Sequence, residues 1–348
     1  MITSLGLEVP ISNLDKELKK LWEGESAGTR ASLTNFAIYS EDPGALERNA
    51  EFLRGVTKEH ACRAILVQNL PGSTIPTLRT WIDSVCQMIG GKKAICSEQI
   101  AFLMENGDVG VVCNTVLAYL DSDLPLVFWW QGDLSERFED RLYSVIDRLI
   151  IDSSTWNNPI EQFAKLIEAN TESNSRFKIN DLSWTRSYHL RNALSKICED
   201  ALARPHLREI KEIRISYSKN QFVSALMLAA WIASCLHAKH LKTRKQQNCF
   251  MFEFQEGRTF LINLDEEDVG CSICSLIIRT ERAEFSLCHR ANSSFIRTFT
   301  NLPERTSEQF MPADRENEIE LVLEQLQRAG NNRLYFQTVI PLLMTLIN

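Results

Sequence analysis

Three short segments of the chain carry residue types that could recognise a ligand or a partner. One apolar run ends in Trp129-Trp130, a second ends in Asp152-Ser153-Ser154, and Asp181-Leu-Ser-Trp-Thr-Arg186 follows further on. Tryptophan and arginine are over-represented among the residues that dominate binding energy between proteins. The planar guanidinium of Arg186 also suits a carboxylate or a phosphate. These segments therefore predict recognition of a partner or an anion.

Catalytic motifs are absent from the sequence. It contains no G-x-S-x-G, G-x-x-x-x-G-K-[ST], G-x-G-x-x-G or H-E-x-x-H string, so serine hydrolase, P-loop, dinucleotide and zincin sites lack their motifs. The six histidines lie outside any recognisable acid–base pair. We therefore expect no catalytic residues, no cofactor and no enzyme activity.

The cysteines offer one spacing that metal sites use, Cys271-Ser-Ile-Cys274. A zinc site needs two more ligands, and Cys288-His289 would supply them from adjacent positions that suit tetrahedral coordination poorly. The alternation around these residues predicts a strand, on which Cys271 and Cys274 point to opposite faces. Ten cysteines in this chain are also too sparse for a disulfide scaffold. We expect buried, reduced thiols and no metal.

The overall composition excludes several classes of protein. A net charge of −7 argues against nucleic-acid binding as the main role, because phosphate binding needs a basic surface. No apolar stretch reaches the roughly 20 residues that a membrane-spanning helix requires. The first residues lack the basic-then-apolar pattern of a secretory signal. We therefore expect a cytoplasmic protein that binds neither membranes nor nucleic acid.

Alternating strand and helix patterns predict an α/β domain over residues 1–172. The apolar runs that end at Trp130 and Asp152 suit strands buried on both faces of a parallel sheet. Leu78–Met88 fits a helix or a strand, and the Gly90–Lys93 turn after it favours a β-hairpin. We expect a mixed, largely parallel sheet with covering helices and with ligand or partner residues at its carboxyl ends. Further strands are expected at Thr29–Tyr39, Cys62–Leu70 and Ala94–Met104, and helices at Ile11–Glu23, Asp42–His60, Asp108–Leu120, Glu136–Asp147 and Pro159–Ala169.

The polar stretch Asn170–Asn180 is the predicted linker to a second domain over residues 180–348. Consecutive alternating segments there predict an antiparallel sheet, and helices before and after them predict an α+β domain. Expected strands are Ile210–Tyr217, Cys249–Gln255, Arg258–Leu264, Ser272–Thr280, Ala283–His289 and Phe295–Phe299, and expected helices run to Ala203 and over Phe222–Lys239, Glu316–Arg328 and Tyr335–Leu346.

The candidate segments also have purely structural explanations. Neighbouring residues on a strand face opposite sides, so Trp129 and Trp130 can each fill a core layer, or one can project and anchor a partner. Asp181 or Ser183 can cap a helix while Trp184 packs inward. The residues alone leave these alternatives open.

Five strings, taken in order, resemble the OpcA family of glucose-6-phosphate dehydrogenase assembly proteins. The resemblance covers about residues 25–240, and beyond Lys245 only the general α+β character is similar. It implies a non-catalytic bacterial protein that binds glucose-6-phosphate dehydrogenase and promotes its assembly or allosteric activation. Such a protein supports the oxidative pentose phosphate pathway and the supply of NADPH. The strings are Thr29-Arg-Ala-Ser-Leu-Thr-Asn35, Cys96-Ser-Glu-Gln-Ile100, Asp123-Leu-Pro-Leu-Val-Phe-Trp-Trp-Gln-Gly132, Arg148-Leu-Ile-Ile-Asp-Ser-Ser154 and Asp181-Leu-Ser-Trp-Thr-Arg186.

Partner binding is expected on a face near the junction of the two domains. The polar ends Thr29-Arg30 and Asp152–Ser154 could form a pocket there, or could cap the elements that follow. Two rival hypotheses remain: an enzyme or sensor that binds a sugar phosphate or nucleotide at the strand ends of the first domain, and a scaffold without kinetic effect. Redox control through the cysteines is a further hypothesis. The residues predicted to bind the partner are Arg30, Trp129, Trp130, Asp152, Trp184 and Arg186.

Overall fold

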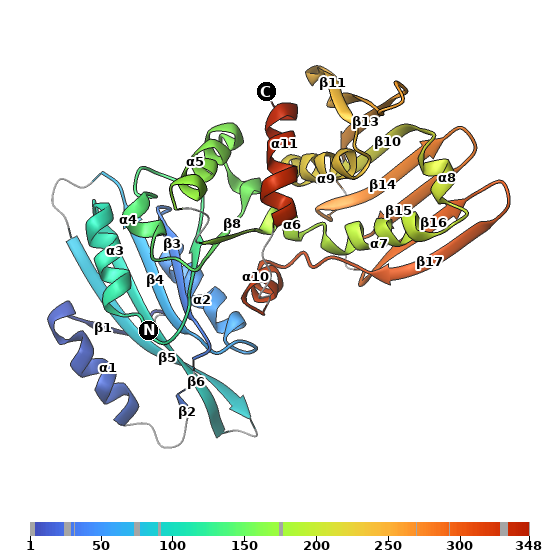
Figure 1. The fold of residues 1–348 in the computed structure, drawn as a ribbon. Helices are drawn as coiled ribbons and strands as arrows, with labels where there is room; N and C mark the ends of the chain where they lie inside the picture. Colours follow the sequence, from blue (N-terminus) through green and yellow to red (C-terminus); the bar gives the residue numbers. More distant parts are fainter. Residues whose placement is uncertain are drawn as a thin grey trace. The chain divides into compact units, whose positions relative to one another are not determined.

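A computed structural model describes residues 4–23, 29–30, 32–72, 77–89, 92–173, 177–268, 270–291, 293–327 and 333–347 (Figure 1). The chain divides into two compact units, and each is described by itself. The first comprises residues 1–152, 164–180 and 318–331, and the second comprises residues 153–163, 181–317 and 332–348. This division differs from the expected domains, 1–172 and 180–348, because a late helix belongs to the first unit.

The first unit is built on a mixed, largely parallel sheet, as expected. Its strand order is β1-β5-β6-β4-β3-β7-β8-β9, and β2 also pairs with β6. Strand β3 is parallel to β4 and β7, while β5 is antiparallel to β6 and to β1. The strands are β1 (Leu7–Val9), β2 (Thr29–Arg30), β3 (Asn35–Ser40), β4 (Arg63–Leu70), β5 (Thr77–Ile89), β6 (Lys92–Glu105), β7 (Leu126–Trp130), β8 (Arg148–Ile151) and β9 (Lys178–Asp181).

Six of these strands follow a known topological pattern. With β3 counted as the first strand, β4, β6, β7, β8 and β9 follow along the chain, and their spatial order is 3-2-1-4-5-6. That order is the one found in dinucleotide-binding α/β sheets, and it reverses between the first and fourth strands, here β3 and β7. We call the carboxyl ends of β3 and β7 the switch point.

Several predicted elements of the first unit differ from the observed ones. Thr29–Tyr39 forms two strands, because Leu33 and Thr34 donate hydrogen bonds to the carbonyls of Ala61 and Pro125. The helix expected over Glu136–Asp147 is only one turn long. The helices are α1 (Leu14–Glu23), α2 (Ala45–Val56), α3 (Val109–Ala118), α4 (Asp140–Tyr143), α5 (Pro159–Glu172) and α10 (Glu318–Gln327), with 3-10 turns at Ile11–Asn13 and Ser153–Thr155.

Helix α10 completes the first unit by packing on α2. Gly55 provides the room for this contact, since an added Cβ would come within 2.5 Å of Cδ1 of Ile319. The Arg148 guanidinium also donates a hydrogen bond to the Gln325 carbonyl of α10. A segment more than 250 residues from α2 in the sequence is therefore part of the first core.

The β5–β6 hairpin corrects the prediction that all cysteines are reduced thiols. Its register places Cys86 directly opposite Cys96, with their Cα atoms 4.0 Å apart, and the two form a disulfide. The prediction failed here because the register of a hairpin, rather than the density of cysteines, decides which thiols meet. The hairpin itself was expected, although its turn at Gly90-Gly91 lies outside the described residues.

Thiol titration of the unfolded chain tests this disulfide. We expect eight reactive thiols without reductant and ten with it, since eight cysteines are free in the structure and the sequence has ten. Reduction should lower the free energy of unfolding by about 2–3 kcal/mol, as for a cross-link that closes a loop of this length. The C86S/C96S variant serves as the control and should give eight thiols under both conditions. Ten thiols without reductant would contradict the prediction.

The second unit is an α+β domain with a largely antiparallel sheet, as expected. Its strand order is β11-β12-β13-β10-β14-β15-β16-β17, and β10 and β13 are parallel neighbours. Both edge strands, β11 and β17, were missed, because they are mostly polar and exposed. The strands are β10 (Ile210–Tyr217), β11 (Lys239–Arg244), β12 (Cys249–Glu253), β13 (Thr259–Glu266), β14 (Ile273–Thr280), β15 (Glu284–His289), β16 (Phe295–Asn301) and β17 (Thr306–Pro312).

Helices pack against this second sheet and against one another. Helix α9 is apolar and almost wholly buried, and α11 lies beside it in Figure 1. Helix α7 lies along β15, β16 and β17. No helix in the described parts of the chain has the length and apolar character needed to cross a membrane. The helices are α6 (Leu182–Thr185), α7 (Tyr188–Glu199), α8 (Arg204–Leu207), α9 (Phe222–Cys235) and α11 (Ile340–Ile347), with a 3-10 turn at Lys245–Gln247 and a π-helix at Tyr335–Val339.

Candidate functional site

The paired tryptophans at the end of β7 lie inside the first unit. The exposed fractions of Trp129 and Trp130 are 2% and 1%. The Trp129 ring packs against Phe52 of α2, with ring centroids 5.0 Å apart, and its Nε1 has no hydrogen-bond acceptor among the described residues. The Trp130 ring lies 4.3 Å from the Tyr39 ring and donates a 2.9 Å hydrogen bond to the Asp133 carbonyl. Neither ring projects from the strand end in this structure.

A polar network that the sequence analysis missed surrounds Trp130 at the switch point. Glu41, just after β3, accepts hydrogen bonds from Tyr39 Oη at 2.8 Å and from Ser135 Oγ at 2.7 Å. Arg137 Nη1 lies 3.4 Å from the same carboxylate oxygen, and its Nε donates to the Gly107 carbonyl at 2.9 Å. Burial and the Glu41 charge raise the pKa of the Tyr39 hydroxyl far above its ordinary value. This network therefore links the ends of β3, β6 and β7.

An amide pair closes the other side of the switch point. Asn49 of α2 donates to Gln131 Oε1 at 2.9 Å, and Gln131 donates back to Asn49 Oδ1 at 3.0 Å. The reciprocal pair satisfies both side chains and holds α2 against the end of β7.

The structure brings together two of the segments predicted from the sequence. Asp181 Oδ1 accepts hydrogen bonds from the backbone N–H groups of Ser153 at 3.1 Å and Ser183 at 2.9 Å. Ser183 Oγ accepts one from Ser154 N at 2.9 Å. Tyr335, from the π-helix, donates to Asp181 Oδ2 at 2.7 Å. Asp181 thus caps α6 and joins three distant segments of the second unit.

Trp184 and Arg186 pack inward beside this cluster. Their exposed fractions are 5% and 9%, and that of Asp152 is 7%. The cation that stacks on Trp184 is Arg191, with its guanidinium carbon 3.3 Å from the ring centre. Arg191 Nη1 also donates to the Trp184 carbonyl at 2.7 Å. Arg191 was not among the predicted residues, because an arginine inside a helix gives no signal of its own.

Arg30 lies far from the carboxyl ends of the strands. It forms β2 with Thr29 and pairs with Cys96, near the start of β6. Nine residues separate that position from the end of β6 at Glu105, which corresponds to roughly 30 Å along a strand. The expected pocket that joins Thr29-Arg30 to Asp152–Ser154 is therefore not formed.

The Cys271–Cys274 pair is buried and bonded within the chain. Cys274 Sγ donates to the Cys271 carbonyl at 3.0 Å, and Cys271 Sγ donates to the His289 carbonyl at 3.3 Å. Burial raises the pKa of the Cys271 thiol to about 12. Within the described residues, no group of three or more His, Cys, Asp or Glu side chains is placed to hold a metal ion.

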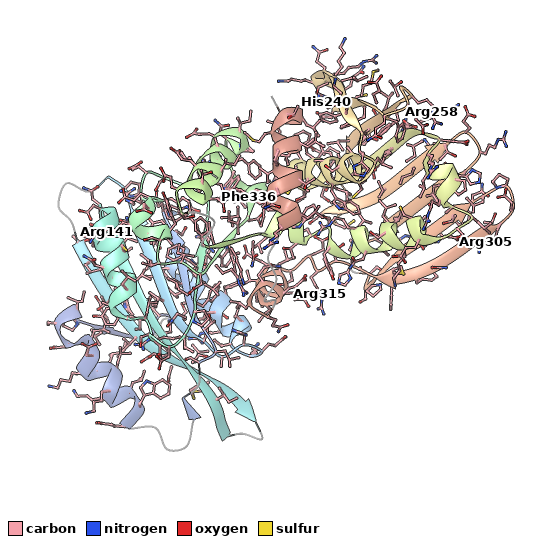
Figure 2. The ribbon with its side chains drawn as sticks, in the orientation of Figure 1. Arg141, His240, Arg258, Arg305, Arg315 and Phe336 are labelled. Carbon is pink, nitrogen blue, oxygen red and sulfur yellow. A yellow bond between two sulfur atoms is a disulfide. The ribbon has the colours of Figure 1, made fainter. Side chains whose placement is uncertain are left out.

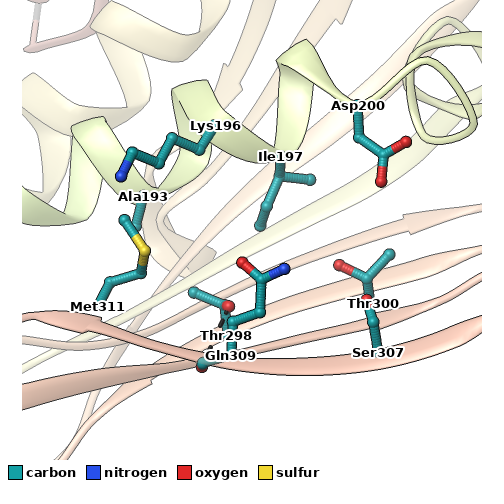
Figure 3. A pocket seen from close by; sticks show the side chains of 9 residues that line it. All are labelled: Ala193, Lys196, Ile197, Asp200, Thr298, Thr300, Ser307, Gln309 and Met311. Carbon is teal, nitrogen blue, oxygen red and sulfur yellow. Dashed lines mark hydrogen bonds between the residues drawn. The ribbon is translucent and has the colours of Figure 1, made fainter.

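A small polar hollow lies between α7 and the β16–β17 hairpin (Figure 3). Thr298, Thr300 and Gln309 rise from the strands toward Ile197 of α7. Arg305, in the turn of the hairpin (Figure 2), pairs with Asp200 at one end. The hollow encloses about 50 Å³, whereas ligand pockets typically measure several hundred Å³. It has room for ordered water rather than for a sugar phosphate.

Asp314 predicts how the stability of the second unit depends on pH. It accepts hydrogen bonds from the N–H groups of His189 and Leu190 in the first turn of α7, and burial raises its pKa to about 7. Between about pH 4 and 7 the folded state therefore holds more protons than the unfolded state, so stability falls as pH rises.

Denaturant titrations of the wild type and D314N at several pH values check this dependence. Relative to D314N, which carries no charge, the wild type should lose about 2 kcal/mol between pH 4.5 and 7.5. Arg191 opposes this shift and Glu316 adds to it. Parallel pH profiles for the two proteins would contradict the prediction.

Comparison with known families decides what kind of chain carries these features. A model described as the glucose-6-phosphate dehydrogenase subunit N-terminal domain of OpcA matches residues 54–168, and the corresponding C-terminal domain model matches residues 177–339. This chain belongs to the OpcA family. The two matches together cover more than half of its residues and fall on both halves of the sequence, as expected from the resemblance.

Relatives with an established description are distant OpcA proteins of cyanobacteria. An OxPP cycle protein OpcA of Nostoc punctiforme is 22% identical over 228 residues, which cover 64% of this chain and 47% of the relative. The protein of the same description from Synechocystis is 28% identical over 144 residues, or 41% and 30%. The one from Synechococcus elongatus is 21% identical over 323 residues, or 86% and 71%. This OpcA chain thus spans about half or less of the first two relatives.

Solved oxidoreductases share the fold of this OpcA chain. KijD10, a 3-ketoreductase from Actinomadura kijaniata solved with NADP, superimposes with a TM-score of 0.51 and 9% identity, over 90% of this chain and 95% of that one. At such low identity the likeness concerns the fold alone. It agrees with the strand order of the first unit and identifies a Gfo/Idh/MocA-like oxidoreductase fold.

Proposed function

We propose that this chain is a non-catalytic subunit that binds glucose-6-phosphate dehydrogenase and promotes its assembly or allosteric activation in the oxidative pentose phosphate pathway. The match of both OpcA domain models, each described as a glucose-6-phosphate dehydrogenase subunit domain, carries this proposal. The OxPP descriptions of the relatives support it. A cytoplasmic location and the absence of enzyme activity belong to the same proposal.

The predicted partner-binding residues take a modified role in this proposal. Trp129, Trp130, Asp152, Trp184 and Arg186 are buried, so they would shape the partner-binding surface from beneath instead of contacting the partner. Arg30 would act separately from them, near the start of β6. Their part in binding stays a prediction.

An activator must bind one state of the dehydrogenase more tightly than another, because equal affinity shifts no equilibrium. The test is co-purification of this chain with the dehydrogenase of the same organism, followed by a substrate titration with and without this chain. We expect a stable complex and a change in apparent substrate affinity or maximal rate of about 5-fold or more.

The control is an unrelated acidic protein of similar size at the same concentration. Neither a complex nor a kinetic change would refute the proposal. A complex with unchanged kinetics would leave the assembly role and exclude the allosteric one.

A further inference from the structure

We infer that the first unit keeps the strand order of a dinucleotide-binding sheet but binds no dinucleotide, because its own side chains fill the switch point. The relevant crevice lies outside the carboxyl ends of β3 and β7, where the strand order reverses. In dinucleotide-binding sheets a glycine-rich turn after the first strand brings the pyrophosphate to a helix N-terminus. Each part of that arrangement is altered in this chain.

The turn after β3 does not fit a pyrophosphate. It has the sequence Glu41-Asp42-Pro43-Gly44, with two carboxylates where an anion would have to approach the backbone. Asp42 N donates to Ser40 Oγ at 3.2 Å, and proline has no N–H to offer. At the start of α2, Leu46 N donates to the buried Gln68 Oε1 at 2.8 Å. Backbone donors that would bind phosphate are therefore already used within the chain.

The positive charge nearest to the crevice is also engaged. Arg137 lies against Glu41 and donates its Nε proton to Gly107, and its side chain is only 13% exposed. A phosphate would have to displace Glu41 from Arg137, Tyr39 and Ser135 together. The guanidinium therefore neutralises a carboxylate of its own chain and is not available to a ligand.

The remaining volume of the crevice is filled by side chains. Trp130 stacks on Tyr39 at the floor, and the Asn49–Gln131 amide pair spans from α2 to the end of β7. At the end of β4, Asn69 donates to the Gly107 carbonyl at 2.8 Å. Dinucleotide-binding sheets hold the ribose with an acidic residue at the end of the second strand, and β4 ends in Gln68-Asn69-Leu70.

Titration of the full chain with NADP⁺, NADPH, NAD⁺ and NADH tests the inference directly. Calorimetry follows the heat of binding, and with NADPH and NADH the quenching of tryptophan emission reports any nicotinamide near Trp130. We expect no saturable signal up to about 1 mM ligand. Saturable binding of any of the four with a Kd below about 100 µM would overturn the inference.

A second experiment tests whether the crevice residues hold one another. E41A and R137A should each lower Tm by about 2–4 °C. The double variant E41A/R137A should lose less than the sum of the two shifts, because the pair is already broken in each single variant.

The matched control is E136A. Glu136 also lies near Arg137, at 3.6 Å, but its side chain is 87% exposed, so its removal should leave Tm unchanged. Additive shifts for E41A and R137A, or a loss in E136A as large as in E41A, would overturn the internal pairing.

Discussion

Replacing Trp130 with alanine is expected to lower the free energy of unfolding by about 3–5 kcal/mol. The ring is 1% exposed, stacks on Tyr39 and donates its Nε1 proton to the Asp133 carbonyl. Alanine leaves a cavity at the centre of the sheet and an unpaired carbonyl at its rim. Denaturant titration followed by circular dichroism measures the loss. A change below about 1 kcal/mol would show that the ring is not packed as described.

The two tryptophans supply a matched control for each other. Both W129F and W130F remove part of a buried indole, but only Trp130 has a hydrogen bond to lose. We therefore expect W130F to cost about 1 kcal/mol more than W129F. Equal costs, or a larger cost for W129F, would contradict this assignment of the two Nε1 groups.

The second large effect is expected at Asp181. D181A should lower the free energy of unfolding by about 3–5 kcal/mol, because it leaves buried groups of Ser153, Ser183 and Tyr335 without their acceptor. Thermal or denaturant unfolding of the purified variant measures the loss. Near-wild-type stability of D181A would mean that the cluster does not hold the second unit together.

Two milder variants separate the contributions of the cluster. D181N keeps an oxygen for the backbone N–H groups, so it should cost less than D181A. Y335F removes only the hydroxyl that donates to Asp181 Oδ2 and should cost about 1–2 kcal/mol. A loss in Y335F as large as that in D181A would place the energy in the tyrosine instead of the carboxylate.

The parts of the fold that were predictable share one property, a strong hydrophobic pattern. β3, β4 and β7 are continuous buried runs, and β13 to β16 alternate, so both kinds of sheet follow from the residues. The edge strands β11 and β17 bury little and therefore leave no pattern to detect. Hairpin register placed Cys86 opposite Cys96, which spacing alone does not indicate.

The candidate site was predictable only where consecutive residues act together. Asp152–Ser154 and Asp181–Arg186 stood out as polar ends of apolar runs, and Asp181 does bind Ser153. Tyr335 was missed because 154 residues separate it from Asp181. Glu41 and Arg137 were missed as well, since each lies in an ordinary turn and they meet only when the sheet forms.

The contact between α10 and α2 has a consequence for protein synthesis. Ribosomes release α2 early, but Ile319, which covers Gly55, emerges only after nearly all of the chain has been translated. Until then the first sheet can be fully paired while one side of α2 remains bare. A nascent or truncated chain that stops before Glu318 would thus carry an apolar surface for chaperones to hold, and its folding would finish only after translation.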